Sequence, residues 1–398
     1  QTLITEGLEK NVDLKIAYTR ITQAEANFKI AKAAVLPSLS AVGQVNHTRT
    51  TGEGNTALEN STTVRTLGLS ASWELNLWGK QTDLSRAKYA SYLNSYAYRN
   101  LIQTALVAKI ANGYYNLMAL DEQLRITKAT EILLTQSAET MQALKNAGQQ
   151  NQAAVEQSNA LLYSTQLMIP VLESKIRQQE NAICTMLGRR PGAVARSVMN
   201  KPIVPDKLYH GVPVQLLAKR PDVQQAELNF RSAYNLTKAA QASLYPTLTI
   251  SPLSVGFIGG SDFFKPANLA ANVVGGITQP LFMKRQLRGN IKIAKAQQEE
   301  ALLNFQNTVT IAGQEVSDIL YSYHMSVEKD SFRIKQIEAL TKAVDYTEEL
   351  LMAGEATYTE VLLAQQNLLT VQLNQINDWL EQYNYSVNLY KALGGGVK

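Results

Sequence analysis

The chain contains the same pattern twice, about half its length apart. The first copy reads as a helical pattern, a proline at Pro37 and then an alternating pattern, and this order returns 209 residues later around Pro246. A second correspondence pairs Gly148 with Gly354, 206 residues further on, each at the end of a long helical pattern. A duplication over a whole chain predicts an architecture built by repetition around an axis.

The duplication predicts three parts. The first repeat covers 1–190, with a β-hairpin over 38–78 and a long helical hairpin whose tip lies near 148. A proline-rich linker covers 191–212, and the second repeat covers 213–398. In the second repeat we expect a β-hairpin over 247–282 and a helical hairpin with its tip near 354.

The helical segments are long. Residues near 2–36 carry apolar positions at three- and four-residue steps, which predicts one helix ending at Pro37. The segment 83–146 contains no proline and would form a rod of about 95 Å at the rise of an α-helix. In the second repeat we expect a helix over about 213–245, broken or bent at Arg220-Pro221, and another over about 286–352.

The hairpins carry alternating side chains over two strands of about ten residues or more, the length that crosses an outer membrane at a tilt. Pro252 falls inside the first strand of the second hairpin, so we expect an edge or a bulge there. No stretch reaches about 18 apolar residues, which argues against a membrane-spanning helix.

Four strands cannot close a barrel, and an open sheet in lipid would leave backbone groups unpaired. Several chains must therefore share one barrel, and three chains would supply twelve strands, enough to enclose an aqueous lumen. The predicted fold is mainly α with β: a long antiparallel α-helical barrel, plus four strands per chain contributing to a 12-stranded transmembrane β-barrel in a trimer.

Composition argues against several other functions. The net charge of +5 is not clustered, which disfavours nucleic acid as a partner. The single cysteine, Cys184, lies in an apolar helical stretch, where we expect it to be buried. The three histidines, His47, His210 and His324, are too scattered for a metal site. We find no nucleophile motif, phosphate loop or paired carboxylates, and therefore predict no catalytic residue, cofactor or enzymatic activity.

Four segments resemble one known family. They are LLAKRPDVQQAE over 216–227, AQASLYP over 240–246, WELNLWGK over 73–80, and VNLYKALGGG over 387–396. The first two resemble the second-repeat signature of the TolC-family outer membrane efflux proteins. The last two are similar to segments of its OprM- and NodT-like lipoprotein branch.

The resemblance implies a homotrimeric exit duct in the outer membrane of a Gram-negative bacterium, with its helical barrel in the periplasm. Its partners would be outer membrane lipid, a periplasmic adaptor and an inner-membrane pump of the RND type, and its cargo small molecules such as drugs. Mature chains of this branch begin with a lipidated cysteine and an extra segment. Neither is found in this sequence, so acylation is not assigned.

The resemblance also places functional residues. Alignment at Gly354 puts Tyr358, Glu360 and Leu363 at the periplasmic gate, where three copies of Glu360 would form a cation-attracting ring. The alternative for Glu360 is an ordinary solvated surface position. Gly148 and Gly354 would lie at tips that contact the adaptor or pump, or would only end their helices.

Trp73 and Trp78 lie close to the end of a predicted strand. This position favours anchoring at the membrane interface, and packing against the helices is the alternative for Trp78.

Two further functions share features of this pattern. A type I protein secretion duct would have the same architecture. A soluble coiled-coil scaffold would share the long helices, but it would have no reason to place two membrane-length strand pairs at matching positions in a duplication.

Overall fold

The computed structural model describes residues 1–50, 60–202, 214–260 and 263–396, and these fold as two compact units. The first, here the helical unit, comprises Gln1–Tyr18, Tyr98–Val223 and Thr308–Lys398. The second, here the sheet unit, comprises Thr19–Ala97 and Gln224–Asn307. Each unit therefore combines segments from both repeats, as a duplicated chain allows.

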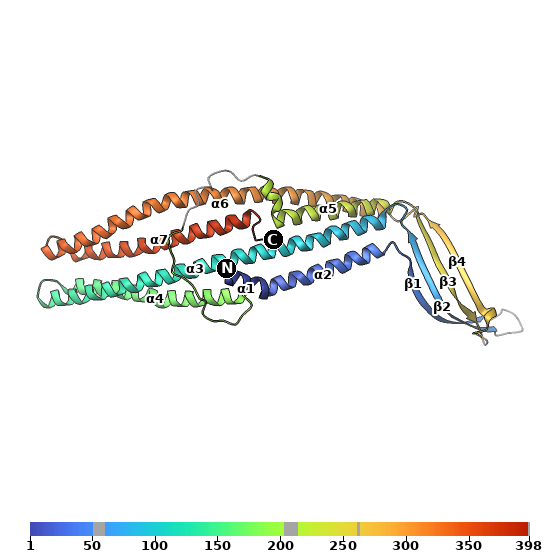
Figure 1. Ribbon diagram of the computed structural model, residues 1–398, viewed down its shortest axis with the longest axis horizontal. Helices are drawn as coiled ribbons and strands as arrows, with labels where there is room; N and C mark the ends of the chain where they lie inside the picture. The colour runs from blue at the N-terminus through green and yellow to red at the C-terminus, as the bar shows by residue number, and fades with distance from the viewer. Residues whose placement is uncertain (51–59, 203–213, 261–262, 397–398) are drawn as a thin grey trace. The chain divides into compact units, whose positions relative to one another are not determined.

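The elements follow the predicted order (Figure 1). The helices are α1 Thr2–Lys10, α2 Val12–Ala33, α3 Lys80–Asn146, α4 Gln152–Met186, α5 Pro221–Ala242, α6 Gln286–Ala353 and α7 Tyr358–Ala392, with 3-10 turns η2 Val214–Lys219 and η3 Pro266–Asn268. The strands are β1 Ser38–Thr50, β2 Asn60–Leu75, β3 Thr247–Gly259 and β4 Leu269–Thr278. Among the described residues, none of the helices has both the length and the apolar character that crossing a bilayer requires.

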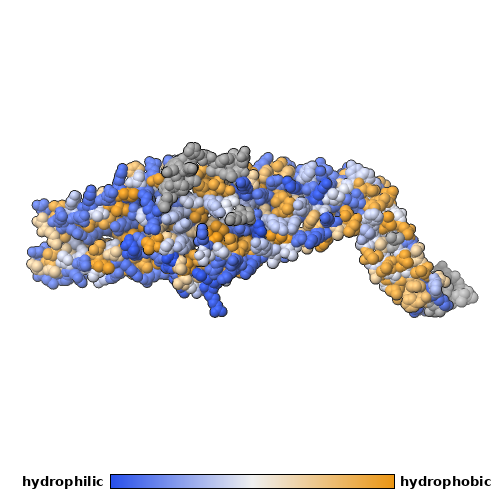
Figure 2. Space-filling model, viewed as in Figure 1, coloured by the Kyte–Doolittle hydropathy of each residue, from blue (hydrophilic) through white to orange (hydrophobic). Residues whose placement is uncertain are grey.

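The four strands form one antiparallel sheet in the order β1-β2-β3-β4. Paired residues share a face, so the registers divide the sheet into a mainly apolar face and a mainly polar face. The apolar face carries Leu39, Ala41, Val45, Leu67, Leu69, Ala71, Trp73, Ile250, Val255, Phe257, Leu269, Ala271, Val273 and Ile277. The polar face carries Ser38, Ser40, Gln44, Asn46, Thr66, Ser70, Ser72, Glu74, Thr247, Thr249, Ser254, Asn272 and Thr278. In Figure 2 hydrophobic side chains are prominent over the strands.

The sheet contains one irregularity, at the position expected from the proline. The register of β3 shifts between Ile250 and Leu253 against β4, and a matching shift occurs against β2 between Ala71 and Trp73. Pro252 lies inside this bulge, where its missing N–H costs no ladder bond. The prediction of a bulge or edge is therefore confirmed.

The single helix expected over 2–36 is wrong, because it is two helices separated by Asn11. Asn11 has an extended backbone, with ψ of 132°. Its side chain donates to the carbonyl of Met186, the last residue of α4, at 2.8 Å and accepts from the Leu14 N–H at 3.0 Å. Asn11 thus caps the C-terminal end of α4 and the N-terminal end of α2. The break expected at Arg220-Pro221 is confirmed, since η2 ends at Lys219 and α5 begins at Pro221.

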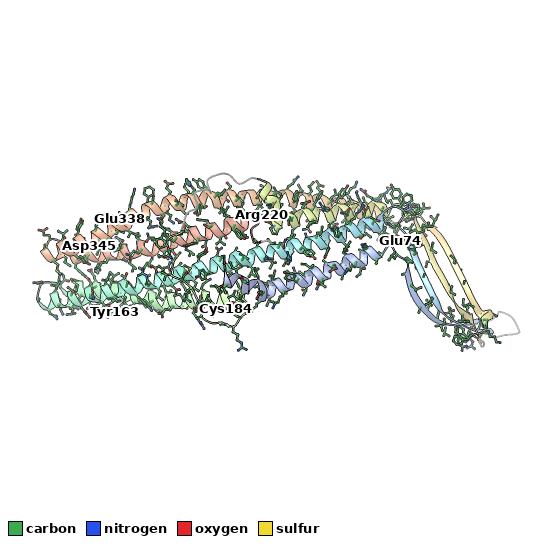
Figure 3. All side chains as sticks on the ribbon, viewed as in Figure 1. Glu74, Tyr163, Cys184, Arg220, Glu338 and Asp345 are labelled. Carbon is green, nitrogen blue, oxygen red and sulfur yellow. The ribbon has the colours of Figure 1, made fainter. Side chains whose placement is uncertain are left out.

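The core of the helical unit includes Ile110, Leu117, Ile183 and Cys184 from α3 and α4, each at most 1 % exposed. The buried position expected for Cys184 is thus confirmed (Figure 3). Its thiol donates to the Gly192 carbonyl at 3.4 Å, which ties the start of the linker to the end of α4.

Candidate functional site

The helical unit contains both hairpin turns. Gly148 ends α3 and Gly354 ends α6, with φ of 74° and 78°, and the residue after each donates back across the turn at 2.9 Å. This pattern is the Schellman motif, in which the left-handed position favours glycine. A Cβ added to either glycine would meet nothing within 4 Å, so both turns have open surroundings.

The ends of the two hairpins pack on each other through one apolar cluster. Its buried members are Met141 from α3, Ala154 and Val155 from α4, and Tyr358, Val361 and Leu362 from α7. The first turn of the last helix is thus held between the two helices of the first repeat. Burial of this kind is the main favourable contribution to the packing of such helices.

Tyr358 also links the hairpins through its hydroxyl. Its Oη donates to Ser158 Oγ on α4 at 2.8 Å and shares a second hydrogen bond with Ser137 Oγ on α3 at 2.9 Å. Tyr358 is 4 % exposed and Ser158 is 2 % exposed, so water does not compete readily for these bonds. We call Tyr358, Ser137 and Ser158 the hydroxyl clasp.

The other two residues expected at the gate lie on the surface of the chain. Leu363 is 58 % exposed, and Glu360 is exposed as well. Glu360 has a local role, because its Oε2 accepts from the Thr357 N–H at 3.1 Å and Thr357 caps the same helix in return. The structure of one chain thus separates a buried tyrosine from two exposed neighbours, and the carboxylate ring stays a prediction.

A cleft of about 480 Å³ lies beside the clasp. It is bounded by α3, α6 and α7, and its lining includes Ser137, Met141, Asp345, Tyr358 and Gln365. Two members of the clasp, Ser137 and Tyr358, therefore lie at the wall of a space between the two hairpins.

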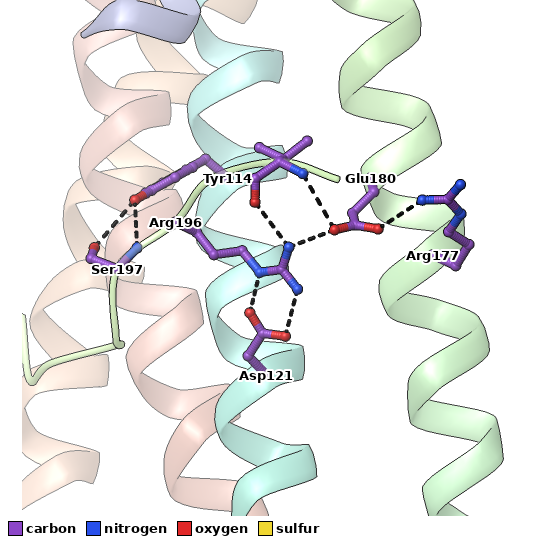
Figure 4. Close-up of polar contacts among 7 residues, drawn as sticks. Tyr114, Asp121, Arg177, Glu180, Arg196 and Ser197 are labelled. Carbon is purple, nitrogen blue, oxygen red and sulfur yellow. Dashed lines mark hydrogen bonds and ion pairs between the residues drawn. The ribbon is translucent and has the colours of Figure 1, made fainter. Parts of the chain in front are cut away.

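The described part of the predicted linker, 191–202, has neither helix nor strand, and the rest of it, to 212, lies outside the described residues. Arg196 attaches this segment to the first hairpin (Figure 4). Its guanidinium binds both oxygens of Asp121 on α3 and donates to Glu180 Oε1 on α4 at 2.5 Å and to the Val194 carbonyl at 2.9 Å.

These contacts shift the ionisation of the groups involved. The hydrogen bonds to Asp121 raise the pKa of the Arg196 guanidinium, although burial opposes the shift. Burial raises the pKa of the Glu180 carboxyl, but the hydrogen bonds from Arg196 and the Val194 N–H outweigh this and hold it below its ordinary value. Both groups are therefore charged at neutral pH.

The same segment reaches the second hairpin. Lys201 Nζ lies 2.8 Å from Asp330 Oδ2 on α6, and Trp379 Nε1 on α7 donates to the other oxygen of Asp330 at 3.2 Å. Met199 is 5 % exposed and packs with Ile376. Residues 193–201, here the strap, thus join α3 and α4 to α6 and α7.

Arg220, labelled in Figure 3, lies 209 residues after Asn11 and binds the last carbonyl of its returning helix as Asn11 does. Its guanidinium donates to the Ala392 carbonyl at 3.1 Å, to both oxygens of Asp222 and to Glu315 Oε2 at 2.6 Å. Burial raises the pKa of the Asp222 carboxyl, and the hydrogen bonds and charge of Arg220 outweigh this effect and lower it. At this equivalent helix break the first repeat has a neutral asparagine, and the second has a charged arginine paired with carboxylates.

The two tryptophans lie in the sheet unit, where strands meet helices. Trp73 Nε1 donates to the Val35 carbonyl at 2.9 Å, and Trp78 Nε1 donates to the Pro246 carbonyl at 2.7 Å. Trp78 also stacks on Tyr245, with ring centroids 4.9 Å apart. Both indoles are partly exposed, at 36 % and 49 %, and hydrogen-bonded at their N–H, and their anchoring at the membrane interface stays a prediction.

Sequence reasoning singled out Tyr358, whose role at a gate stays a prediction, but it did not identify the partners of its hydroxyl or the strap. Ser137 and Ser158 carry no local signal, because each is an ordinary polar residue in a long helix. Arg196 could have been noticed as the one cation within 192–199, a stretch of otherwise small and apolar residues. Within the described residues, no group of three histidine, cysteine or acidic side chains is arranged to hold a metal ion.

Comparison with known proteins gives a consistent result. The chain is 28% identical over 397 residues to "Probable outer membrane lipoprotein SilC" of Salmonella typhimurium, covering 99% of this chain and 85% of that protein. It is 29% identical over 407 residues to "Pyoverdine export outer membrane protein OpmQ" of Pseudomonas putida, again covering 99% and 85%. The solved outer-membrane channel OprN superposes with a TM-score of 0.93 at 24% identity, covering 99% of this chain and 89% of OprN, which shows the same fold.

The sequence profile of one family, described as "Outer membrane efflux protein", matches residues 3–189 and 212–395. The two matched ranges correspond to the two repeats, and they leave out most of the linker between them. The match speaks against a soluble scaffold and agrees with the alternating strands. The chain belongs to the outer membrane efflux protein family, and it is an outer membrane exit duct of an efflux system.

Proposed function

We propose that the chain acts as a homotrimer that encloses a continuous duct across the outer membrane. The two-faced sheet is the observation that carries this proposal, because one face is mainly apolar and the other mainly polar. Within the described residues, β1 and β4 are each paired on one side only, so both edges are open to further strands. Three copies would pair these edges into twelve strands, with the apolar face toward lipid and the polar face toward water.

The proposed cargo consists of small molecules or ions, delivered by an inner-membrane pump of the RND type through a periplasmic adaptor. The printed names of the relatives include cation, pyoverdine and solvent efflux, which favours small solutes over secreted proteins. The proposed contact points are the turns at Gly148 and Gly354, because both are open and lie on hairpins of one unit.

The proposed gate combines the clasp with the exposed residues beside it. Tyr358 holds the first turn of α7 against α3 and α4, which supports a narrow arrangement of the hairpin ends. Glu360 and Leu363, exposed on the same helix, would meet their copies around the axis in the trimer. A ring of three carboxylates would attract cations.

Single-channel conductance in a planar bilayer tests both parts. Purified full-length protein should insert as a cross-linkable trimer with a small, cation-selective conductance, and Glu360→Gln should reduce the selectivity. Glu338→Gln, which removes an exposed carboxylate from α6, is the matched control and should leave selectivity unchanged. Failure of the trimer to insert would refute the duct, and equal selectivity in both variants would refute the carboxylate ring alone.

A further inference from the structure

The segment between β4 and α6 exposes apolar side chains. Leu281 is 92 % exposed and Phe282 is 84 % exposed, the highest values among the large hydrophobic residues that the structure describes. They follow shortly after Ile277, which is 73 % exposed on the apolar face of the sheet. Exposed apolar side chains thus follow shortly after the last strand.

A run of cations follows directly. Lys284, Arg285, Arg288, Lys292 and Lys295 are all exposed. The sequence contains only one acidic residue, Asp262, between Glu227 and Glu299. Among the described residues, none of these five cations forms an ion pair. The charge of this segment is therefore uncompensated by the chain itself.

The corresponding junction of the first repeat is different. There Lys80 pairs with Glu74 at 3.2 Å, and Arg86 pairs with Asp83 at 3.2 Å. The two repeats share one pattern, yet within the described residues the first junction pairs Lys80 and Arg86 and leaves only Lys88 unpaired, whereas the second junction pairs none of its five cations. Both junctions connect a strand to a helix of nearly equal length, so helix length does not account for the difference in charge pairing.

The backbone at the second junction is also unusual. Lys284 and Arg285 have φ of 44° and 64°, whereas the position equivalent to Arg285 in the first repeat is Gly79, with φ of 75°. Left-handed backbone is unfavourable for a residue with a Cβ. Such conformations persist mainly where function or the surrounding structure requires them. Here the turn holds two successive cations beside the exposed Leu281 and Phe282.

We propose that residues 281–295 form a binding surface for anionic phospholipid in the membrane leaflet at which the strands end. Leu281 and Phe282 enter the boundary between acyl chains and headgroups. The five cations bind the phosphate groups of lipids such as phosphatidylglycerol. Exposed apolar residues next to a cluster of four to eight cations match the chemistry of an anionic membrane surface, and the partly exposed Trp78 in the same unit fits that interface.

Quenching of tryptophan fluorescence by brominated lipids tests this surface, because Trp73 and Trp78 lie in the sheet unit. Full-length protein is placed in bilayers that mix phosphatidylcholine and phosphatidylglycerol, with one or the other brominated, and the ratio of their association constants is measured. We expect a preference for phosphatidylglycerol of at least about fivefold, which is the ratio that a single cation contributing about 1 kcal/mol near an anionic surface would give. Lys284→Gln/Arg285→Gln/Arg288→Gln removes three of the five cations and should lower the ratio to less than half its wild-type value.

The control variant Lys29→Gln/Arg86→Gln/Lys88→Gln removes the same charge from the same unit, and two of its cations are already paired within the chain. It should keep the wild-type ratio. A ratio near one in the wild type, or an equal decrease in both triple variants, would overturn the proposal. Inorganic phosphate is also added to the wild-type protein in the same mixed bilayers. Loss of the preference for phosphatidylglycerol under this condition would overturn the proposal, because the surface would then bind a free anion.

A second variant guards against misfolding. Lys284→Gly/Arg285→Gly removes two charges and relieves two left-handed positions, so its thermal stability should equal or exceed that of the wild type. It should nevertheless lose part of the preference for phosphatidylglycerol. An unchanged preference in this stable variant would refute a role for the two residues with positive φ.

Discussion

Tyr358→Phe is the sharpest test of the clasp. The substitution keeps the aromatic ring in the cluster with Met141 and Val361 and removes only the hydroxyl. That hydroxyl makes two hydrogen bonds, at 2.8 Å to Ser158 and 2.9 Å to Ser137. The variant therefore separates the hydrogen bonds from the apolar packing.

The magnitude follows from the two bonds. A neutral hydrogen bond contributes about 0.5–1.5 kcal/mol, and a buried polar group left without a partner costs about 1–3 kcal/mol. Ser158 is 2 % exposed and would lose its Tyr358 partner, whereas Ser137 lies beside the cleft. We expect the packed arrangement to lose about 2 kcal/mol, which corresponds to roughly a thirtyfold increase in the equilibrium constant for separating the hairpins.

Two measurements report this change. Single-channel recording should show an increased open probability, and hydrogen exchange should be faster for the amides of the first turns of α7. Thr359→Val is the matched control, because Thr359 lies next to Tyr358 but its hydroxyl makes only a long, exposed contact of 3.5 Å to Gln157. The control should shift either measurement by less than about 0.5 kcal/mol. If Tyr358→Phe behaves like Thr359→Val in both measurements, the clasp does not hold the gate.

Two further predictions concern stability. Arg220→Met should lower the free energy of unfolding by about 2–3 kcal/mol, because Asp222 and Glu315 would lose their cation, and their partial exposure makes the loss smaller than for a fully buried pair. The pKa of the Asp222 carboxyl is lowered in the folded chain, so the stability that this carboxylate supplies is complete at neutral pH and is lost as the pH falls below about 4. Thermal unfolding between about pH 3 and 7 should therefore depend less on acid in Arg220→Met than in the wild type. Gly68→Ala should destabilise the sheet by about 1–3 kcal/mol, because the added Cβ would lie 2.5 Å from the Val255 carbonyl oxygen. The control Gly275→Ala, whose added Cβ would meet nothing within 4 Å, should change the thermal unfolding temperature little. Equal shifts of the unfolding temperature in the two variants would contradict the close approach of β2 and β3.

The elements of this fold follow from local patterns. The helical segments lack proline over long stretches, and the strands alternate with a period of two, so the secondary structure was predictable from side chains a few residues apart. The duplication added one more constraint, since a break at Arg220 implies a break at its equivalent position. That implication was available for Asn11 and was missed, because an asparagine interrupts a helix less visibly than a proline does.

The contacts that form the clasp and the strap could not be predicted in this way. The clasp joins Tyr358 to serines about 200 residues away, and the strap joins Arg196 to carboxylates on two helices, pairings that no local pattern specifies. Repeats, strand faces, helix ends and the cationic junction are properties of neighbouring residues, and the sequence by itself determined them. Which hydroxyl contacts which partner depends on the axial register between neighbouring long helices. Many registers would bury similar apolar faces, so only the tertiary structure determines the one that forms.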